Sequence, residues 1–262
     1  MMRLGASTAR FWGFERDVIR TLGFISEYFN VAEIWVEPPF YPNWRTSKEK
    51  ADLDRLMDVL VVTELETTVH APHHELSLCS WNPAVTATTI REIIKSLEMA
   101  SEINSKAVTF HAGKQRLSGD DSKNILRGNL EVLDDTASEY SSKLCLENPH
   151  DGHLSIEEIL DLTKDLKSIY LTLDLAHLSA QKTDLSRYKT RLRRKVGNVH
   201  VSRIDGRGKH RPLASETKFM KNSLRTLKEI KYKGAVILEG ATGENPEKII
   251  PKEIAAYKRM IR

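Results

Sequence analysis

The chain has 262 residues, of which 40% are hydrophobic and 29% are charged, and its formal net charge at pH 7 is +4. This composition is typical of a folded globular protein with one large core, and chains of this length often form a single α/β barrel. The mild positive charge permits an anionic substrate but does not require a nucleic acid. The two cysteines, Cys79 and Cys145, are too few for a disulfide framework and do not form a CxxC pair.

Neither a signal peptide nor a membrane span is indicated. The N-terminal segment MMRLGASTARFWGFERD has no uninterrupted apolar stretch, and nowhere do about 18 apolar residues run together. We therefore expect a cytoplasmic protein with no membrane partner.

Short strand-like segments alternate with helix-like segments along the whole chain. The predicted strands cover residues 3–7, 31–37, 66–70, 107–111, 143–147, 169–174, 197–202 and 234–239. Between them lie stretches rich in Leu, Ile, Glu and Lys, with helix-start signals at Asn82-Pro83, at Ser155 with Glu158, and at Asn245-Pro246. This alternation predicts a single (β/α)8 TIM barrel over residues 1–262, with no boundary between domains.

The predicted strands have two different faces. One face carries large apolar side chains that suit packing against outer helices, so the other face is expected to point into the barrel. On the inner face, six successive strands end in a residue that can bind a metal: His70, His111, Glu147, Asp174, His200 and Glu239. Because the carboxyl ends of barrel strands meet at one mouth, where barrel enzymes keep their active sites, these residues predict a ring of metal ligands.

The distribution of histidine supports this ring. All nine histidines fall at predicted strand ends or in the loops that follow them, and none falls in a predicted helix. A ring of carboxylates with one imidazole suits Mn, Mg or Co, whereas additional histidine ligands move the preference toward Zn. We therefore predict a divalent metal cofactor at the mouth.

Several motifs occur in the order and spacing of a known superfamily. The segments VHAPHHELSLCSWNP, VTFHAGK, CLENP, LTLDLAH, NVHVS and VILEG together resemble the xylose isomerase-like TIM barrels, which include sugar isomerases, sugar epimerases and endonuclease IV. The resemblance covers nearly the whole chain. It implies a metal site, shared by both branches, that is made by Glu147, Asp174, His200 and Glu239.

For the isomerase and epimerase branch, the resemblance implies that Glu147 and Glu239 lie on opposite sides of the reacting carbon. One carboxylate would remove a proton, and the same carboxylate or the other would return it, while the metal holds the substrate oxygens. His177 resembles the family histidine that contacts substrate. The alternative is that it binds no substrate and only forms a hydrogen bond with a metal ligand. The expected substrate is a small sugar, a sugar phosphate or a related hydroxy-carbonyl compound.

The endonuclease IV branch, which cleaves DNA at apurinic sites, is the alternative enzyme. His70 and His111 match ligands of its cluster of three zinc ions, and Glu147 matches the carboxylate that bridges that cluster. His177 and His210 match the histidines of its third metal. DNA is expected as a partner only under this alternative.

The third zinc site of the endonuclease branch has a gap in this chain. That site also needs an aspartate two residues before the last histidine, and the corresponding position here is Gly208. Asp205 is the nearby candidate to replace it. A barrel that binds metal without catalysing a reaction is a third hypothesis.

Basic residues are concentrated in two places. The run RYKTRLRRK, residues 187–195, ends the sixth helical segment and is expected at the bottom of the barrel, away from the metal. A second set follows the seventh strand and is expected at the mouth, where barrels often bind phosphate: Arg203, Arg207, Lys209 and Arg211. Lys114, directly after the segment HAG, is a further candidate for substrate binding. This placement favours a phosphorylated or acidic small molecule and also tolerates a DNA backbone.

Aromatic residues follow the first and third predicted strands. They are candidates for a roof that excludes water from a small pocket: Phe11, Trp12, Phe14 and Trp81. Packing within the loops is the alternative role for these side chains.

Overall fold

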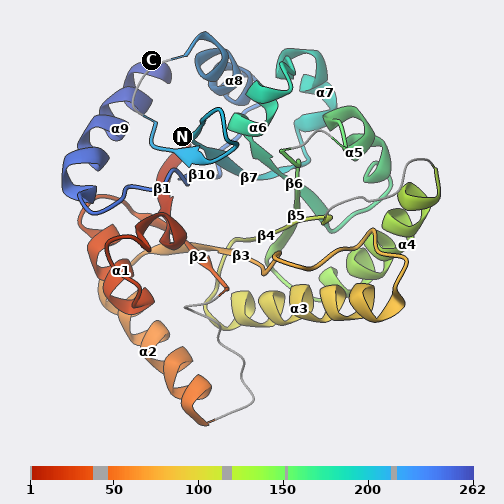
Figure 1. Cartoon of the computed structure of the whole chain (residues 1–262), viewed down its shortest axis with the longest axis horizontal. Coiled ribbons are helices and arrows are strands. Elements are labelled where there is room, and N and C mark those ends of the chain that lie inside the picture. Colours follow the sequence, from red (N-terminus) through yellow and green to blue (C-terminus); the bar gives the residue numbers. More distant parts are fainter. Residues whose placement is uncertain (1, 38–46, 114–119, 151–152, 214–216) are drawn as a thin grey trace.

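The computed structural model describes residues 2–37, 47–113, 120–150, 153–213 and 217–262. Within these residues, eight parallel strands form a closed barrel that the longer helices surround (Figure 1). The barrel strands are β1 (Arg3–Ser7), β2 (Val31–Trp35), β3 (Glu66–His70), β4 (Ala107–Phe110), β5 (Lys143–Glu147), β6 (Ile169–Asp174), β7 (Val196–Val201) and β10 (Ala235–Leu238). β1 pairs with β10 and closes the ring, which confirms the predicted TIM barrel.

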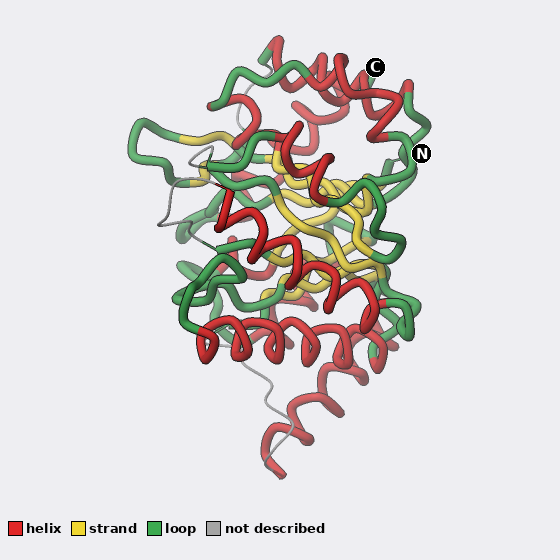
Figure 2. The backbone as a smooth tube through the Cα atoms, turned by 90° about the vertical axis from the view of Figure 1, so that its right-hand side faces the viewer, coloured by secondary structure: helices red, strands yellow, loops and turns green. Residues whose placement is uncertain are grey.

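The helices connect successive strands on the outside of the barrel, as the edge-on view in Figure 2 shows. They are α1 (Val18–Ser26), α2 (Ser47–Thr63), α3 (Pro83–Glu102), α4 (Asp120–Ala137), α5 (Ile156–Leu162), α6 (Leu175–Ala180), α7 (Lys189–Leu192), α8 (Lys218–Glu229) and α9 (Pro246–Met260). Single turns of 3-10 helix occur at η1 (Thr8–Phe11) and η2 (Leu185–Tyr188). Among the described residues, no helix combines the length and the apolar character needed to cross a membrane.

The helix-start signals act as the sequence predicts, with one difference. The side chain of Asn82 accepts a hydrogen bond from the Ala84 amide, and a proline follows Asn82 at the first helical position. Ser155 and Glu158 form a reciprocal capping box at the start of α5. Asn245 precedes α9 without a side-chain cap bond, so the proline after it is the effective start signal there.

Two local features differ from the expected alternation. The sixth helical segment is divided into α6, η2 and α7 because Lys182 adopts a left-handed φ of 53° and the Asp184 side chain then caps η2 through the Ser186 amide. After β7 the chain forms an unpredicted two-stranded hairpin from β8 (Arg203–Ile204) and β9 (His210–Arg211). Figure 2 shows this small sheet on the side of the barrel away from the N-terminus.

The barrel interior below the mouth is closed by tightly packed side chains. The hydroxyl oxygens of Thr109 and Thr172 lie 2.8 Å apart, and Asn198 Nδ2 donates to Thr109 Oγ1 at 3.1 Å. Near the amino ends of the strands, a separate apolar cluster is formed by Val31, Ala235 and Ile237. The large outward-facing side chains belong to the main hydrophobic core between strands and helices. The polar residues at the carboxyl ends of the strands therefore lie at the mouth, above the packed interior of the barrel.

Candidate metal centre

Four of the predicted ligands meet at the carboxyl ends of β5, β6, β7 and β10. Ligand atoms of Glu147, Asp174 and His200 lie within 4.8 Å of one another. Glu239, which follows β10 directly, places Oε1 3.0 Å from Nδ1 of His200, and Glu147 Oε2 lies 3.3 Å from the same nitrogen. Two carboxylates thus flank one imidazole nitrogen, and the carboxylate of Asp174 lies in the same buried cluster.

Two atoms of this cluster are buried without a hydrogen-bond partner in the described structure: His200 Nδ1 and Asp174 Oδ2. Asp174 Oδ1 is occupied, because it accepts the backbone amide of His177 at 2.7 Å. Buried polar atoms normally have partners, since an unpaired one costs free energy. An imidazole nitrogen and carboxylate oxygens are the donors that Mn, Co or Zn prefer, and the oxygen-rich set also suits Mg. The residues present therefore fit a divalent metal ion.

Electrostatics separates the two glutamates of the cluster. Burial raises the pKa of Glu239 well above its usual range, and the nearby carboxylates of Glu147 and Asp174 raise this pKa further. Burial also acts to raise the pKa of Glu147, but His111 and His200 outweigh it and hold this pKa well below its usual range. In a site with such a pair, one carboxyl favours the ionised form and the other the protonated form.

His70 and His111 approach the same carboxylate from the other side. His111 Nε2 lies 3.2 Å from Glu147 Oε2, and His70 Nε2 lies 3.6 Å from this oxygen. His70 Nδ1 is 2.9 Å from the Ala71 carbonyl oxygen, so this nitrogen donates and Nε2 faces Glu147. His73 joins them, because ligand atoms of His70, His73 and His111 lie within 4.8 Å of one another. This group is a second place where the chain offers several metal-binding atoms.

His177 and His210 form a third group, with Asp174. The Nε2 atoms of the two histidines lie 3.1 Å apart, and His210 Nδ1 lies 2.7 Å from the Ser202 hydroxyl. Ligand atoms of Asp174, His177 and His210 fall within 4.8 Å of one another. The carboxylate of this group therefore comes from β6, beneath the histidines.

Asp205 does not fill the gap at Gly208. Its Oδ1 accepts the amides of Arg207 and Lys209 at 2.9 and 3.0 Å, and its Oδ2 accepts from Arg211 at 2.8 Å. These bonds shape the turn of the β8–β9 hairpin. Gly208 has a φ of +75° in this turn, and a Cβ there would lie 3.2 Å from the His150 ring. A side chain at this position is therefore disfavoured by both backbone and space.

The two basic sets occupy the places that the sequence predicts. Arg203, Arg207 and Lys209 are exposed on the β8–β9 hairpin beside the mouth. The run 187–195 lies just before β7, at the amino end of that strand, and Lys195 Nζ there donates to three backbone carbonyl oxygens. Lys114 lies outside the described residues. The hairpin is thus the basic surface that adjoins the candidate centre.

Two of the four aromatic residues, Phe11 and Phe14, pack against α1 and do not form the expected roof. Phe11 is fully buried and packs edge-on against Phe24 of α1, with ring centroids 5.6 Å apart. Phe14 also packs against Phe24, at 5.2 Å. Both rings therefore pack on the apolar face of α1. Trp12 contacts Trp35 at 6.2 Å.

Trp81, the fourth of these aromatic residues, is exposed, with 62% of its surface accessible. Trp35, at the end of β2, stacks on His70 with ring centroids 3.9 Å apart. Trp35 rather than the phenylalanines therefore contributes the aromatic wall next to the histidines.

The inner face of β2 was missed in the sequence analysis. Glu33 is fully buried and lies 2.9 Å from His200 Nε2, and Glu37 accepts the His74 amide at 2.8 Å. The signal was present, because the period of two in VAEIWVE places Glu33, Trp35 and Glu37 on one face. The predicted strand 31–37 also ends in a carboxylate, Glu37, but it was left out of the predicted ring.

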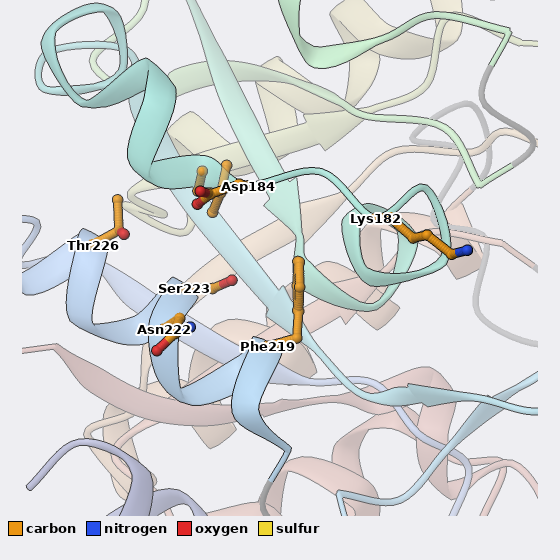
Figure 3. A pocket seen from close by; sticks show the side chains of 7 residues that line it. Lys182, Asp184, Phe219, Asn222, Ser223 and Thr226 are labelled. Carbon is orange, nitrogen blue, oxygen red and sulfur yellow. The ribbon is translucent and has the colours of Figure 1, made fainter.

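A small pocket of about 160 Å³ lies apart from these groups, between η2 and α8 (Figure 3). It is lined by Lys182, Asp184, Leu185, Phe219, Asn222, Ser223 and Thr226. None of these residues belongs to the three histidine and carboxylate groups. The pocket is therefore separate from the candidate metal centre.

Comparison with known proteins agrees with the fold. The family model described as xylose isomerase-like TIM barrel matches residues 22–260. Uncharacterized protein MJ1188 of Methanocaldococcus jannaschii is 26% identical over 255 residues, which cover 91% of this chain and 88% of that protein. Uncharacterized protein MJ1311 of the same organism is 29% identical over 197 residues, covering 70% of this chain and 67% of that protein.

Two solved structures have the same architecture. A D-tagatose 3-epimerase-like protein has a TM-score of 0.81 at 22% identity and covers 99% of this chain and 98% of its own. The 3-keto-D-glucoside 4-epimerase YcjR from E. coli also has a TM-score of 0.81, at 17% identity, covering 99% of this chain and 100% of its own. At these identities the likeness shows a common fold.

Proposed function

The chain belongs to the xylose isomerase-like TIM barrel family, and from this premise we propose that it is a divalent-metal-dependent sugar isomerase or epimerase. The observation that carries the proposal is the convergence of Glu147, Asp174, His200 and Glu239 in one buried cluster, in which His200 Nδ1 and Asp174 Oδ2 have no hydrogen-bond partner. The two similar structures are those of an epimerase-like protein and an epimerase, which supports this reaction class. We further propose that residues 1–262 form one domain of this kind.

Glu147 and Glu239 are the proposed proton-transfer pair. A divalent ion held by the four ligands would polarise a substrate carbonyl and so acidify the adjacent C–H bond. Each glutamate has one oxygen beside His200, while the other oxygen points toward a different histidine. Glu147 Oε1 lies 3.5 Å from His177 Nδ1, and Glu239 Oε2 lies 3.7 Å from His210 Nδ1. One of the two glutamates would take the proton, and the same glutamate or the other would return it.

The remaining candidates receive roles around this pair. We assign His70 and His111 to metal binding with Glu147, because both rings turn Nε2 toward its carboxylate. His177 and His210 stand beside the two glutamates, where they would contact the substrate hydroxyls.

The basic surface beside the mouth suggests the charge of the substrate. Arg203 and Arg207 are exposed on the β8–β9 hairpin and suit a phosphate or carboxylate group. Lys114, which follows the β4 histidine in sequence, is retained as a further substrate-binding candidate. The proposed substrate is therefore a small sugar, preferably phosphorylated, or a related hydroxy-carbonyl compound.

The proposal is tested with purified protein loaded with Mn²⁺, Co²⁺, Mg²⁺ or Zn²⁺. We expect exchange of a carbon-bound hydrogen with D₂O, followed by NMR, on one member of a panel of ketoses and their phosphates. The panel includes D-tagatose and L-ribulose, because a D-tagatose 3-epimerase-like protein and an L-ribulose 3-epimerase have similar structures. Metal removal should abolish the exchange and metal return should restore it. A protein that binds no divalent ion and exchanges no hydrogen on any member would refute the proposal.

A metal-dependent endonuclease for abasic DNA remains the second candidate. The observation that favours it is the pair of additional histidine groups, one with His70 and His111 and the other with His177 and His210. Metal analysis separates the two candidates, because the endonuclease reading requires three zinc ions per chain. Cleavage of abasic-site DNA that is lost on His70→Ala or His111→Ala would establish it.

A further inference from the structure

Glu33 is a buried carboxylate directly behind one ligand of the candidate metal centre. It lies on the inner face of β2 and has no accessible surface. Its Oε2 lies 2.9 Å from His200 Nε2, and the same oxygen accepts from Asn198 Nδ2 at 2.9 Å and from Thr68 Oγ1 at 3.3 Å. A charged group at this depth is retained only where fixed donors replace its lost solvation.

The contact with Glu33 decides which nitrogen of His200 carries a proton. Nε2 lies 2.9 Å from Glu33 Oε2 and 3.1 Å from Asn198 Nδ2. The carboxylate can only accept, and the amide already donates to Glu33 and to Thr109, so Nε2 is the nitrogen that donates to Glu33. The other nitrogen, Nδ1, is then the one whose lone pair a metal ion can bind once its proton is displaced. Nδ1 is the atom that faces Glu239 at 3.0 Å and Glu147 at 3.3 Å, and it is buried without a hydrogen-bond partner.

We propose that Glu33 is a positioning residue that fixes the ring of His200 and presents its Nδ1 to a divalent ion. The inference rests on the metal site of the proposed function, to which it adds a residue that binds no metal itself. A carboxylate behind a histidine ligand selects the tautomer and makes the ligand nitrogen more basic.

The distribution of contacts on Glu33 agrees with this role. All three donors meet Oε2, the oxygen nearest His200, whereas Oε1 has no hydrogen-bond partner in the described structure. Asn198 and Thr68 therefore hold the oxygen that contacts the histidine. If the only role of this carboxylate were to link neighbouring strands, donors placed on both oxygens would leave fewer buried acceptors unsatisfied.

The test compares Mn²⁺ affinity, measured by calorimetry, for wild type and three variants. Glu33→Leu removes the acceptor, and the affinity should fall about 10–100-fold. Glu33→Gln retains an oxygen for the Nε2 proton but loses the charge, so its affinity should lie between wild type and Glu33→Leu. Glu229→Gln is the matched control, because it makes the same change of glutamate to glutamine in a surface ion pair with Lys189; its affinity should stay close to wild type.

A second readout uses ¹⁵N-histidine NMR of the Zn²⁺-loaded protein. In wild type, His200 should show a protonated Nε2 and a metal-shifted Nδ1, and this pattern should be lost or mixed in Glu33→Leu. If Glu33→Leu does not fold, Glu33→Gln must bind Mn²⁺ more weakly than Glu229→Gln.

Each outcome has a distinct meaning. Wild-type affinity for Mn²⁺ in every folded Glu33 variant would overturn the positioning role and leave the proposed function standing. Absence of Mn²⁺ binding by the wild type would overturn the proposed function and this inference together.

Discussion

Replacing Glu239 by glutamine tests whether this side chain moves a proton. The carboxyl is buried at the mouth, with Oε1 3.0 Å from His200 Nδ1 and Oε2 3.7 Å from His210 Nδ1. Glutamine has almost the same shape and retains an oxygen that can face a cation. Its amide cannot exchange a proton with a substrate carbon, so Glu239→Gln removes the chemistry while preserving the outline of the site.

The expected loss is large for turnover and smaller for metal binding. A positioned acid–base group contributes about 10²–10⁴-fold to a rate, which is about 3–5 kcal/mol of activation free energy. Metal binding should weaken less, because Glu147, Asp174 and His200 remain in place. The variant therefore separates proton transfer from occupancy of the site.

The assay follows exchange of the substrate hydrogen with D₂O by NMR and measures Mn²⁺ affinity in parallel. Glu229→Gln is the matched control, because Glu229 lies on the surface of α8 in an ion pair with Lys189 at 2.5 Å. This control should exchange hydrogen at the wild-type rate. Exchange at the wild-type rate in Glu239→Gln would remove Glu239 from the mechanism.

Three further predictions concern stability and the competing activity. Gly197→Ala should lower the free energy of unfolding in urea by about 1–3 kcal/mol, because its Cβ would lie 2.4 Å from a buried thiol sulfur. Gly128→Ala is the control: its Cβ meets nothing within 4 Å, so this variant should not lower the free energy of unfolding. Lys123 and the Ser155 amide lower the pKa of Glu158 to about 2 from the usual 4.5, so Glu158 stabilises the fold above about pH 4.5. At pH 7, Glu158→Gln should lower the free energy of unfolding in urea by about 0.5–1 kcal/mol, as expected for a solvent-accessible cap. This difference from wild type should vanish as the pH falls toward 2, and a difference that persists at pH 2 would contradict this account. Zinc-loaded protein should not cleave abasic-site duplex DNA in a gel assay at moderate salt, and rapid metal-dependent cleavage would reverse our preference.

The barrel and its mouth were predictable because both depend on local periodicity. A strand in a barrel alternates between the core and the interior, so a period of two identifies the inner face without any long-range information. The carboxyl ends of parallel strands lie at the same end of the barrel, and this places Glu147, Asp174 and His200 together although 53 residues separate the first from the last. The prediction needed only the strand ends.

The features that were missed depend on contacts between distant segments. Phe11 and Phe14 turn to α1 because Phe24 completes an apolar cluster there, which the local sequence does not reveal. Asp205, which the sequence offered as a replacement metal ligand, instead accepts backbone amides of its own turn and so stabilises the β8–β9 hairpin. The alternation of VAEIWVE places Glu33 on the inner face, but its role depends on His200, which lies 167 residues further along the chain.

The position of Asp174 argues against three independent metal sites in this barrel. Ligand atoms of Asp174 lie within 4.8 Å of those of Glu147 and His200 on one side and of those of His177 and His210 on the other. Its Oδ1 is already held by the His177 amide, which leaves Oδ2 as the one oxygen without a hydrogen-bond partner. An ion at the main centre would draw on this oxygen, and Asp205 could not replace it because it is committed to the hairpin. The other carboxylate oxygens near the two histidines, Glu147 Oε1 and Glu239 Oε2, belong to ligands of the main centre. Neutral imidazoles alone compensate poorly for the charge of a divalent ion. The pair is therefore better suited to hydrogen bonding with substrate hydroxyls, as an isomerase or epimerase requires.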